Sequence, residues 1–170
     1  MNKKTSNSYT LLIIIVVGFI SLIILARYLS TNNAFPPFKG IDMKELFTGT
    51  STIAIQTSLG NIDAEVVDTI ALRERGLSGR ISMPPNRGML FVFDSPGMYG
   101  FWMKDMHIPL DMIWIDADHK VVSTNLEVAT TTYPDMYFPT ENVQYILELN
   151  AGAATEYGIK IGDTLNFILK

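Results

Sequence analysis

The feature that most constrains this chain is an uncharged, apolar run of eighteen residues, Tyr9–Ala26, rich in Leu, Ile and Val. As a helix it would extend about 27 Å, slightly less than an average hydrocarbon core. Arg27 and Tyr28 follow it and can lengthen the span by reaching the membrane interface. The run is apolar on every face, unlike a helix that packs one side on a globular core. It therefore predicts a transmembrane anchor.

Two interpretations of this segment remain open, an uncleaved anchor and a cleaved secretory signal. The run exceeds the ~7–15 apolar residues of a typical signal peptide, and Asn32-Asn33-Ala34 is a poor cleavage site, which favours the anchor. Lys3 and Lys4 precede the run, so the positive-inside rule places the N-terminus in the cytoplasm and the body outside. We therefore expect a single-pass membrane protein that contacts the bilayer through residues 9–26, or, on the alternative, a secreted one.

The chain divides into three predicted regions. Residues 1–28 form a cytoplasmic tip and the anchor, residues 29–41 form a linker that contains Pro36 and Pro37, and residues 42–170 form one extracytoplasmic globular domain. From Asp42 onward, nine basic residues stand against seventeen acidic ones, a net charge of −8. This charge disfavours nucleic acid as a partner. The absence of cysteine excludes thiolate metal sites and thiol nucleophiles.

The apolar pattern of the body predicts a mainly β (α+β) fold, a compact antiparallel β-sandwich or partly open barrel with two or three short helices. Met89–Phe93 is continuously apolar and lies between turn residues, which is typical of a strand covered on both faces. The other predicted strands are Thr52–Thr57, Asn61–Val67, Tyr99–Lys104, Leu110–Asp116, Lys120–Val128, Val143–Leu149 and Thr164–Leu169. The predicted helices are a brief one over 42–47, one capped by Asp68 that ends near Gly76, and one capped by Asn150 over Ala151–Tyr157.

A series of short motifs extends from Glu74 to the C-terminus. They are Arg75-Gly76-Leu77, Gly88-Met89-Leu90-Phe91-Val92-Phe93, Phe101-Trp102-Met103-Lys104, Ile108-Pro109-Leu110-Asp111 and Leu147-Glu148-Leu149-Asn150-Ala151-Gly152. In their order they resemble a widespread prokaryotic family labelled domain of unknown function 192. The resemblance implies a compact β-rich fold behind a signal or anchor segment. It implies no activity.

Trp102 and Lys104 are the first candidates for a binding site. On a strand, period two places Tyr99, Phe101 and Met103 on one face and Trp102 and Lys104 on the other. An aromatic ring beside a cation can hold a sugar or another polar ring by stacking and a charged hydrogen bond. The alternative is that Trp102 closes the core and Lys104 is solvated.

Arg80, Asp111 and Glu148 are further candidates, because each lies within or beside an apolar segment and would be costly there unless paired. Alternation along the predicted strands gives both carboxylates apolar neighbours on their own face, so both could point inward toward Arg80 or Arg75. One outcome is a buried structural ion pair. The other is a cleft in which a carboxylate with a shifted pKa acts as general acid or base.

The sequence gives little support for a bound metal ion or cofactor. Methionines and one histidine cluster between Met98 and Met112 and could suit a soft ion, but Met103 and Met112 are on predicted strands and are interpreted as core filling. Glycine-rich phosphate loops, Gly-x-Ser-x-Gly elbows and His-Glu-x-x-His pairs are absent from the sequence. We therefore predict no metal site and no cofactor.

Three functional hypotheses follow. The leading one is a membrane-tethered binding or accessory domain for a small polar or saccharide-like ligand, such as a cell-envelope component. Its predicted ligand-binding residues are Arg80, Trp102, Lys104, Asp111 and Glu148. The alternatives are a hydrolase or lyase that uses Asp111 or Glu148 as acid or base near Arg80, and a protein-interaction module that docks through an exposed aromatic patch.

Overall fold

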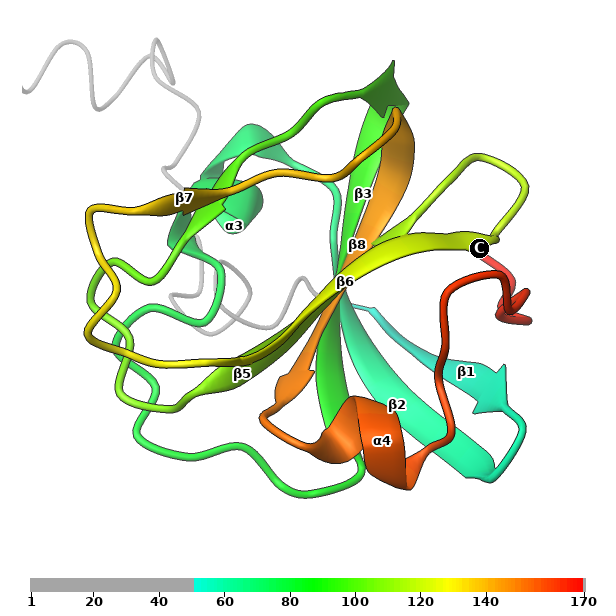
Figure 1. Ribbon diagram of the computed structural model, residues 1–170, viewed down its shortest axis with the longest axis horizontal. Helices are drawn as coiled ribbons and strands as arrows, with labels where there is room; N and C mark the ends of the chain where they lie inside the picture. Colours follow the sequence, from blue (N-terminus) through cyan, green and yellow to red (C-terminus); the bar gives the residue numbers. More distant parts are fainter. Residues whose placement is uncertain (1–50, 170) are drawn as a thin grey trace, which may run out of the picture. The chain divides into compact units, whose positions relative to one another are not determined.

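The computed structural model describes residues 51–169, which form a mainly β domain (Figure 1). Its strands are β1 (Thr52–Thr57), β2 (Gly60–Val67), β3 (Arg87–Gly97), β4 (Phe101–Trp102), β5 (Leu110–Ile115), β6 (Val121–Val128), β7 (Met136–Tyr137) and β8 (Val143–Asn150). Its helices are α3 (Ile70–Arg75) and α4 (Ala153–Glu156). Six strands form one sheet in the order β1-β2-β3-β8-β5-β6, and β4 pairs with β7. The prediction of a mainly β fold with short helices is confirmed.

The predicted anchor, the linker and the helix over 42–47 lie outside the described residues. Among residues 51–169, no helix has the length and apolar character needed to cross a membrane.

The prediction of a purely antiparallel fold is wrong at one pair, because β2 and β3 run parallel. The chain leaves β2 at Val67, passes through α3, and returns along residues 68–86 to the start of β3. Parallel neighbours need a crossover of about this length, whereas a short turn can join only antiparallel ones. The other ladders of the sheet are antiparallel.

The strand predicted over Thr164–Leu169 is also wrong, although this segment does contact the sheet. Its residues pair at isolated bridges, Asn166 with Gln56 of β1 and Thr164 with Lys120 in the turn before β6. Each edge therefore gains a single residue pair, and no ladder closes the sheet into a barrel.

Side chains of the six-stranded sheet alternate between two apolar cores, as the pleat requires. Along β8, Tyr145 and Leu147 belong to the first core and Ile146 to the second. The first core also includes Ala153 of α4, and the second extends to α3 and the β4–β7 pair. Glu148 follows Ile146 by two residues, so its side chain shares the face of the second core.

Three boundaries of helices and strands differ from their predicted positions, each for a local reason. Thr69 rather than Asp68 caps α3, since its hydroxyl oxygen accepts a hydrogen bond from the Leu72 amide at 3.3 Å. Asn150 does not cap α4, because it still belongs to β8 and its amide nitrogen donates to the Met83 carbonyl at 3.0 Å. The helix begins only after the left-handed Gly152.

Candidate functional site

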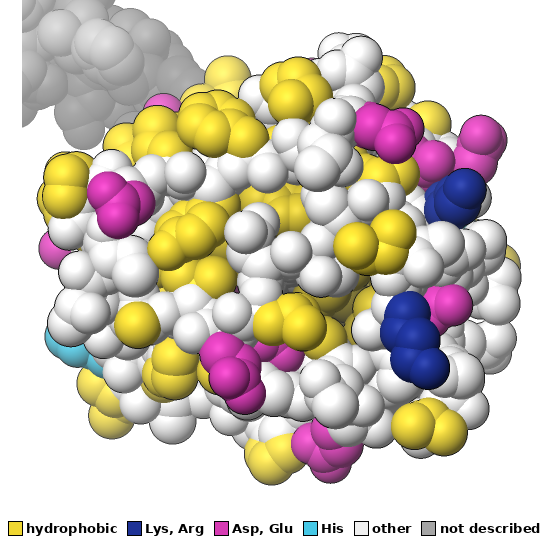
Figure 2. Space-filling view, in the orientation of Figure 1, with side chains coloured by type: hydrophobic (Ala, Val, Ile, Leu, Met, Phe, Trp, Pro, Cys, Tyr) yellow, Lys and Arg dark blue, Asp and Glu magenta, His cyan; other side chains and the backbone are white. Residues whose placement is uncertain are grey.

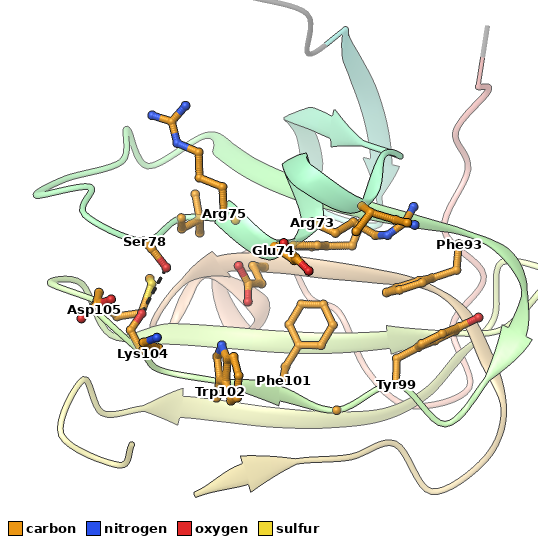
Figure 3. A pocket seen from close by; sticks show the side chains of 17 residues that line it. Arg73, Glu74, Arg75, Ser78, Phe93, Tyr99, Phe101, Trp102, Lys104 and Asp105 are labelled. Carbon is orange, nitrogen blue, oxygen red and sulfur yellow. Dashed lines mark hydrogen bonds between the residues drawn. The ribbon is translucent and has the colours of Figure 1, made fainter. Parts of the chain in front are cut away.

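A cavity of about 620 Å³ opens on the side of the second core, within the usual size range of small-molecule sites. Figure 3 shows Arg73 and Glu74 of α3 on one side of it, and Phe101 and Trp102 of β4 on the other. Glu148 lines it from β8, a central strand of the sheet. The site thus unites a helix, a short strand of the separate two-stranded sheet and the middle of the six-stranded sheet.

Glu148 is the most unusual residue of this cavity, because its side chain is only 4% exposed and has no hydrogen-bond or ion-pair partner among residues 51–169. Its register neighbours are Met89 of β3 and Met112 of β5, which are both apolar. In this part of the chain every fully sealed side-chain oxygen or nitrogen has a partner. The Glu148 carboxyl oxygens must therefore retain access to the cavity.

Burial determines the protonation of Glu148. Desolvation raises the pKa of this carboxyl group to about 8, and no other cause contributes. The group is therefore mostly a neutral acid at pH 7. No basic residue within residues 51–169 forms an ion pair with this carboxyl group.

Aromatic rings form much of the cavity wall. Phe93 and Tyr99 stack with their ring centroids 3.6 Å apart, and Phe101 meets Phe91 edge to face at 4.7 Å. Trp102 is 49% exposed at the rim. The cavity therefore offers ring faces and edges on which a ligand can pack.

Arg73 is held against this aromatic wall by its surroundings. Its guanidinium group donates to the carbonyl oxygens of Val92, at 2.7 Å, and Asp68. Its Cζ atom lies 4.9 Å from the centroid of the Phe93 ring, within the range of a cation–π contact. The wall thus already accommodates one organic cation.

The structure brings together three of the five predicted site residues, namely Trp102, Lys104 and Glu148. The interpretation of Trp102 as a residue that closes the core is wrong, since half of its surface is exposed. Lys104 is exposed at the rim, and its carbonyl oxygen accepts a hydrogen bond from the Ser78 hydroxyl at 3.1 Å. The alternating pattern of Tyr99–Lys104 is confirmed in burial, although only Phe101–Trp102 forms a strand.

Asp111 lies elsewhere, on the opposite face of the sheet from Glu148. Its neighbour Ile113 belongs to the first core, while Glu148 faces the second. The buried Asp111 carboxylate accepts hydrogen bonds from the backbone amides of Glu127, at 2.7 Å, and Ala154, at 2.9 Å. These bonds give Asp111 a structural role, in which it joins β6 to the start of α4.

Arg80 also lies outside the cavity. Its guanidinium group forms two hydrogen bonds with the Glu65 carboxylate, at 2.8 and 2.5 Å. The predicted pairing of Arg80 with Asp111 or Glu148 is therefore wrong. The parallel β2–β3 crossover brings Arg80 back to β2, a contact that strand alternation alone does not predict.

The Arg80–Glu65 pair permits a first prediction. The hydrogen bond from Arg80 is the largest cause that lowers the pKa of Glu65 in the folded domain. The pair therefore stabilises the domain at pH values above the ordinary pKa of glutamate. This stabilisation is lost as the pH falls through the lowered pKa of Glu65 in the folded state. Both side chains are partly exposed. A double-mutant cycle of Arg80→Ala and Glu65→Ala, measured by urea unfolding, should give a coupling of about 1 kcal/mol at pH 7. A coupling that does not shrink below pH 4 would contradict this account.

The sequence does not predict several of the residues that line the cavity. Arg73 reaches Phe93 because α3 lies against β3, and Tyr99 stacks on Phe93 from the segment that follows β3. Phe93 carried a partial signal, since it ends the apolar run Met89–Phe93 and alternates with the buried Phe91. Arg73 carried none, because an arginine on a short helix is most often solvated.

Other parts of the described domain are less suited to bind a polar ligand. A second cavity of about 610 Å³ beside β1 has His119 as its one titratable lining residue, and the His119 ring stacks on Phe167 at 3.9 Å. Met103 and Met112 are buried, as expected of core filling. Within residues 51–169, no group of three or more His, Asp or Glu side chains could hold a metal ion.

Comparisons with known proteins address the identity of the whole domain. A protein from Sinorhizobium meliloti named a "putative transcription regulator" has a solved structure that is 30% identical, with a TM-score of 0.65 over 69% of this chain and 95% of that one. A protein of unknown function from Novosphingobium aromaticivorans is 27% identical, with a TM-score of 0.62 over 69% of this chain and 84% of that one. No curated protein matches the chain.

The family comparison covers nearly all of the described domain. The model of the DUF192 family, described as "Uncharacterized ACR", matches residues 52–167, from the start of β1 to the C-terminal segment. This range includes every residue of the cavity. The chain belongs to the DUF192 family.

Proposed function

We propose that this protein is a membrane-tethered, extracytoplasmic binding domain for a small polar or saccharide-like ligand, which occupies the cavity between α3 and β4. The single observation that carries the proposal is the Glu148 carboxyl group, buried without a partner where it lines an aromatic cavity. A buried polar group that lacks a partner is costly. A ligand that supplies the missing partner would offset this cost.

The remaining site residues have distinct roles in this proposal. The Trp102 ring packs against the ligand at the rim, and the Lys104 ammonium group donates to its polar substituents. Arg80 and Asp111 have no part, because they are engaged elsewhere. The membrane tether and the extracytoplasmic location rest on the apolar run Tyr9–Ala26.

The proposal predicts that Trp102→Ala and Lys104→Ala weaken binding of the natural ligand, with the larger loss for Trp102→Ala. We expect a loss of at least about tenfold for Trp102→Ala, which corresponds to about 1.4 kcal/mol. A glycan and metabolite panel, screened by differential scanning fluorimetry and then titrated by calorimetry on the full-length chain, provides the measurement.

Two matched variants control this experiment. Lys120→Ala removes an exposed lysine from the turn before β6, outside the cavity, and should bind as the wild type does. Trp102→Phe keeps an aromatic ring and should retain most of the affinity. If Trp102→Ala and Lys104→Ala fold normally yet bind every panel member like the wild type, or if no panel member binds at all, the proposed function is wrong.

A second candidate function follows from Glu148 alone. A carboxyl group with a raised pKa in an aromatic cavity is suited to act as a general acid. Asp111 cannot be its partner, because it lies on the other face of the sheet. A turnover screen of the same panel would detect such an activity, and Glu148→Gln should abolish it.

A further inference from the structure

The chemistry of the cavity restricts the class of ligand further than size alone. Three kinds of group could meet the Glu148 carboxyl group: an anion, a neutral hydroxyl or amide, and an ammonium cation. An anion is the least suitable, since it would have to be desolvated beside a buried acid and among Phe91 and Phe101. The ligand group that meets Glu148 is therefore either a neutral hydroxyl or amide, or an ammonium cation.

The walls near Glu148 favour a cation. Phe91, Tyr99, Phe101 and Trp102 line the cavity beside Phe93, whose ring is already covered by Tyr99 and Arg73, and the uncovered ring faces attract positive charge. The guanidinium group of Arg73 above Phe93 shows that this wall stabilises an organic cation in the folded protein. Three carboxyl groups line the cavity, and Glu148 is the buried one, whereas Glu74 and Asp105 are exposed, so Glu148 is placed to neutralise a cation deeper in the cavity.

The charge of the whole domain acts in the same direction. The body carries a net charge of −8, and Figure 2 shows acidic side chains spread over one face with few basic ones among them. Such a field attracts cations and raises their local concentration. The charged groups that line the cavity are Arg73, Glu74 and Arg75 from α3, Lys104 and Asp105 after β4, and Glu148 itself. They balance to zero once Glu148 is ionised.

We infer that the ligand presents an ammonium group to Glu148, and that the site therefore selects amines, such as amino sugars, over their neutral counterparts. This inference rests on the proposed function and specifies its ligand class. The ammonium nitrogen donates hydrogen bonds to the Glu148 carboxylate and packs against the aromatic rings. The polar remainder of the ligand lies toward Trp102 and Lys104 at the rim.

Binding of an ammonium ligand to Glu148 changes the number of protons that the protein holds. Glu148 is mostly protonated at pH 7, so an ammonium ligand must displace its proton, which passes to the buffer while the ammonium group stays protonated. We expect the release of about one proton for each ligand bound at pH 7. Affinity should increase about tenfold per pH unit from pH 6 toward pH 8. A neutral ligand would release no proton, and its affinity would not increase in this way.

The test uses matched probes on the full-length chain. One set is 6-amino-6-deoxyglucose, its N-acetyl derivative and glucose, and the other is ethanolamine, N-acetylethanolamine and ethylene glycol. Each set keeps the skeleton and replaces an ammonium group by an amide or a hydroxyl. Calorimetry at pH 7 in two buffers of different ionisation enthalpy measures affinity and proton release together. The amine of a set should bind at least about tenfold more tightly than its two counterparts.

Glu148→Gln is the decisive variant, because it keeps the size and hydrogen-bonding capacity of a neutral acid but cannot ionise. It should abolish the preference for the amine and the release of the proton. The inference is overturned if Glu148→Gln binds the amines as tightly as the wild type, if the neutral counterparts bind equally well, or if no amine binds. Should Glu148→Gln fail to fold, the pH dependence and proton release of the wild type decide alone.

Failure of this inference is distinguishable from failure of the proposed function. If the amines do not bind but a neutral panel member does, and its binding requires Trp102, then only the ligand class is wrong. If no panel member binds in a manner that requires Trp102, both are wrong.

Discussion

Raising the pH from about 4.5 to 8 is expected to destabilise the folded domain by as much as about 5 kcal/mol. In the unfolded chain Glu148 ionises near its ordinary pKa of 4.5, whereas in the folded domain burial raises the pKa of this carboxyl group to about 8. Between these values the folded state holds a proton that the unfolded state has lost, so each pH unit favours unfolding by about 1.4 kcal/mol. The stabilisation is complete below pH 4.5 and is lost by pH 8.

Urea unfolding of the full-length chain at several pH values measures this slope, and two variants isolate its source. Glu148→Gln cannot titrate, so its stability should be nearly flat where that of the wild type falls. Glu148→Met fills similar space with an apolar side chain and should exceed the wild type in stability at pH 8. A wild-type profile parallel to that of Glu148→Gln would show that the carboxyl group is better solvated than its 4% exposure indicates.

Replacement of Asp111 should produce the second large effect, a loss of about 2–5 kcal/mol for Asp111→Ala. The fully buried carboxylate accepts hydrogen bonds from the Glu127 and Ala154 amides, and both bonds involve a charged acceptor. Alanine removes both and leaves a cavity where the Ala154 amide is buried. The junction between β6 and α4 would therefore lose its shared anchor.

Two comparisons make this second prediction specific. Asp111→Asn keeps one acceptor oxygen but turns an amide nitrogen toward the other donor, so an intermediate loss is expected in urea unfolding. Ligand affinity of the folded Asp111→Asn protein should equal that of the wild type, because Asp111 faces the first core and the cavity faces the second. A selective loss of affinity with normal stability would place Asp111 in the binding site after all.

Most strands were predictable from the sequence because their signals are local. The hairpin of β1 and β2, the strand pair β5 and β6, and β8 each show alternation or an apolar run between turn residues. Elements that depend on distant partners were less predictable. β4 pairs only with the two residues of β7, and the segment after Thr164 pairs at single bridges. Their lengths reflect what lies opposite them, and the local sequence does not contain that information.

The candidate site shows the same division between residues. Trp102, Lys104 and Glu148 were recognisable as an aromatic residue, a cation and an acid placed in or beside apolar strands. Arg80 and Asp111 are likewise charged residues in or beside apolar segments. In the structure, however, Arg80 pairs with Glu65, and Asp111 accepts hydrogen bonds from two backbone amides. The sequence shows which charged residues lie in apolar segments and therefore need a partner, but the order of the strands in the sheet determines which partner each one meets.

The sequence by itself determined a mainly β domain, a strongly acidic body and the set of charges that need partners, since these follow from periodicity and composition. Tertiary structure alone decided which of those charges stay unpaired. The parallel crossover through α3 brings Arg80 to Glu65, and the pleat of the sheet turns Asp111 to the opposite face. Aromatic rings from β3 and β4 line the cavity that Glu148 shares. Which side chains meet across a sheet depends on register and handedness, which are properties of the whole chain and not of any local segment.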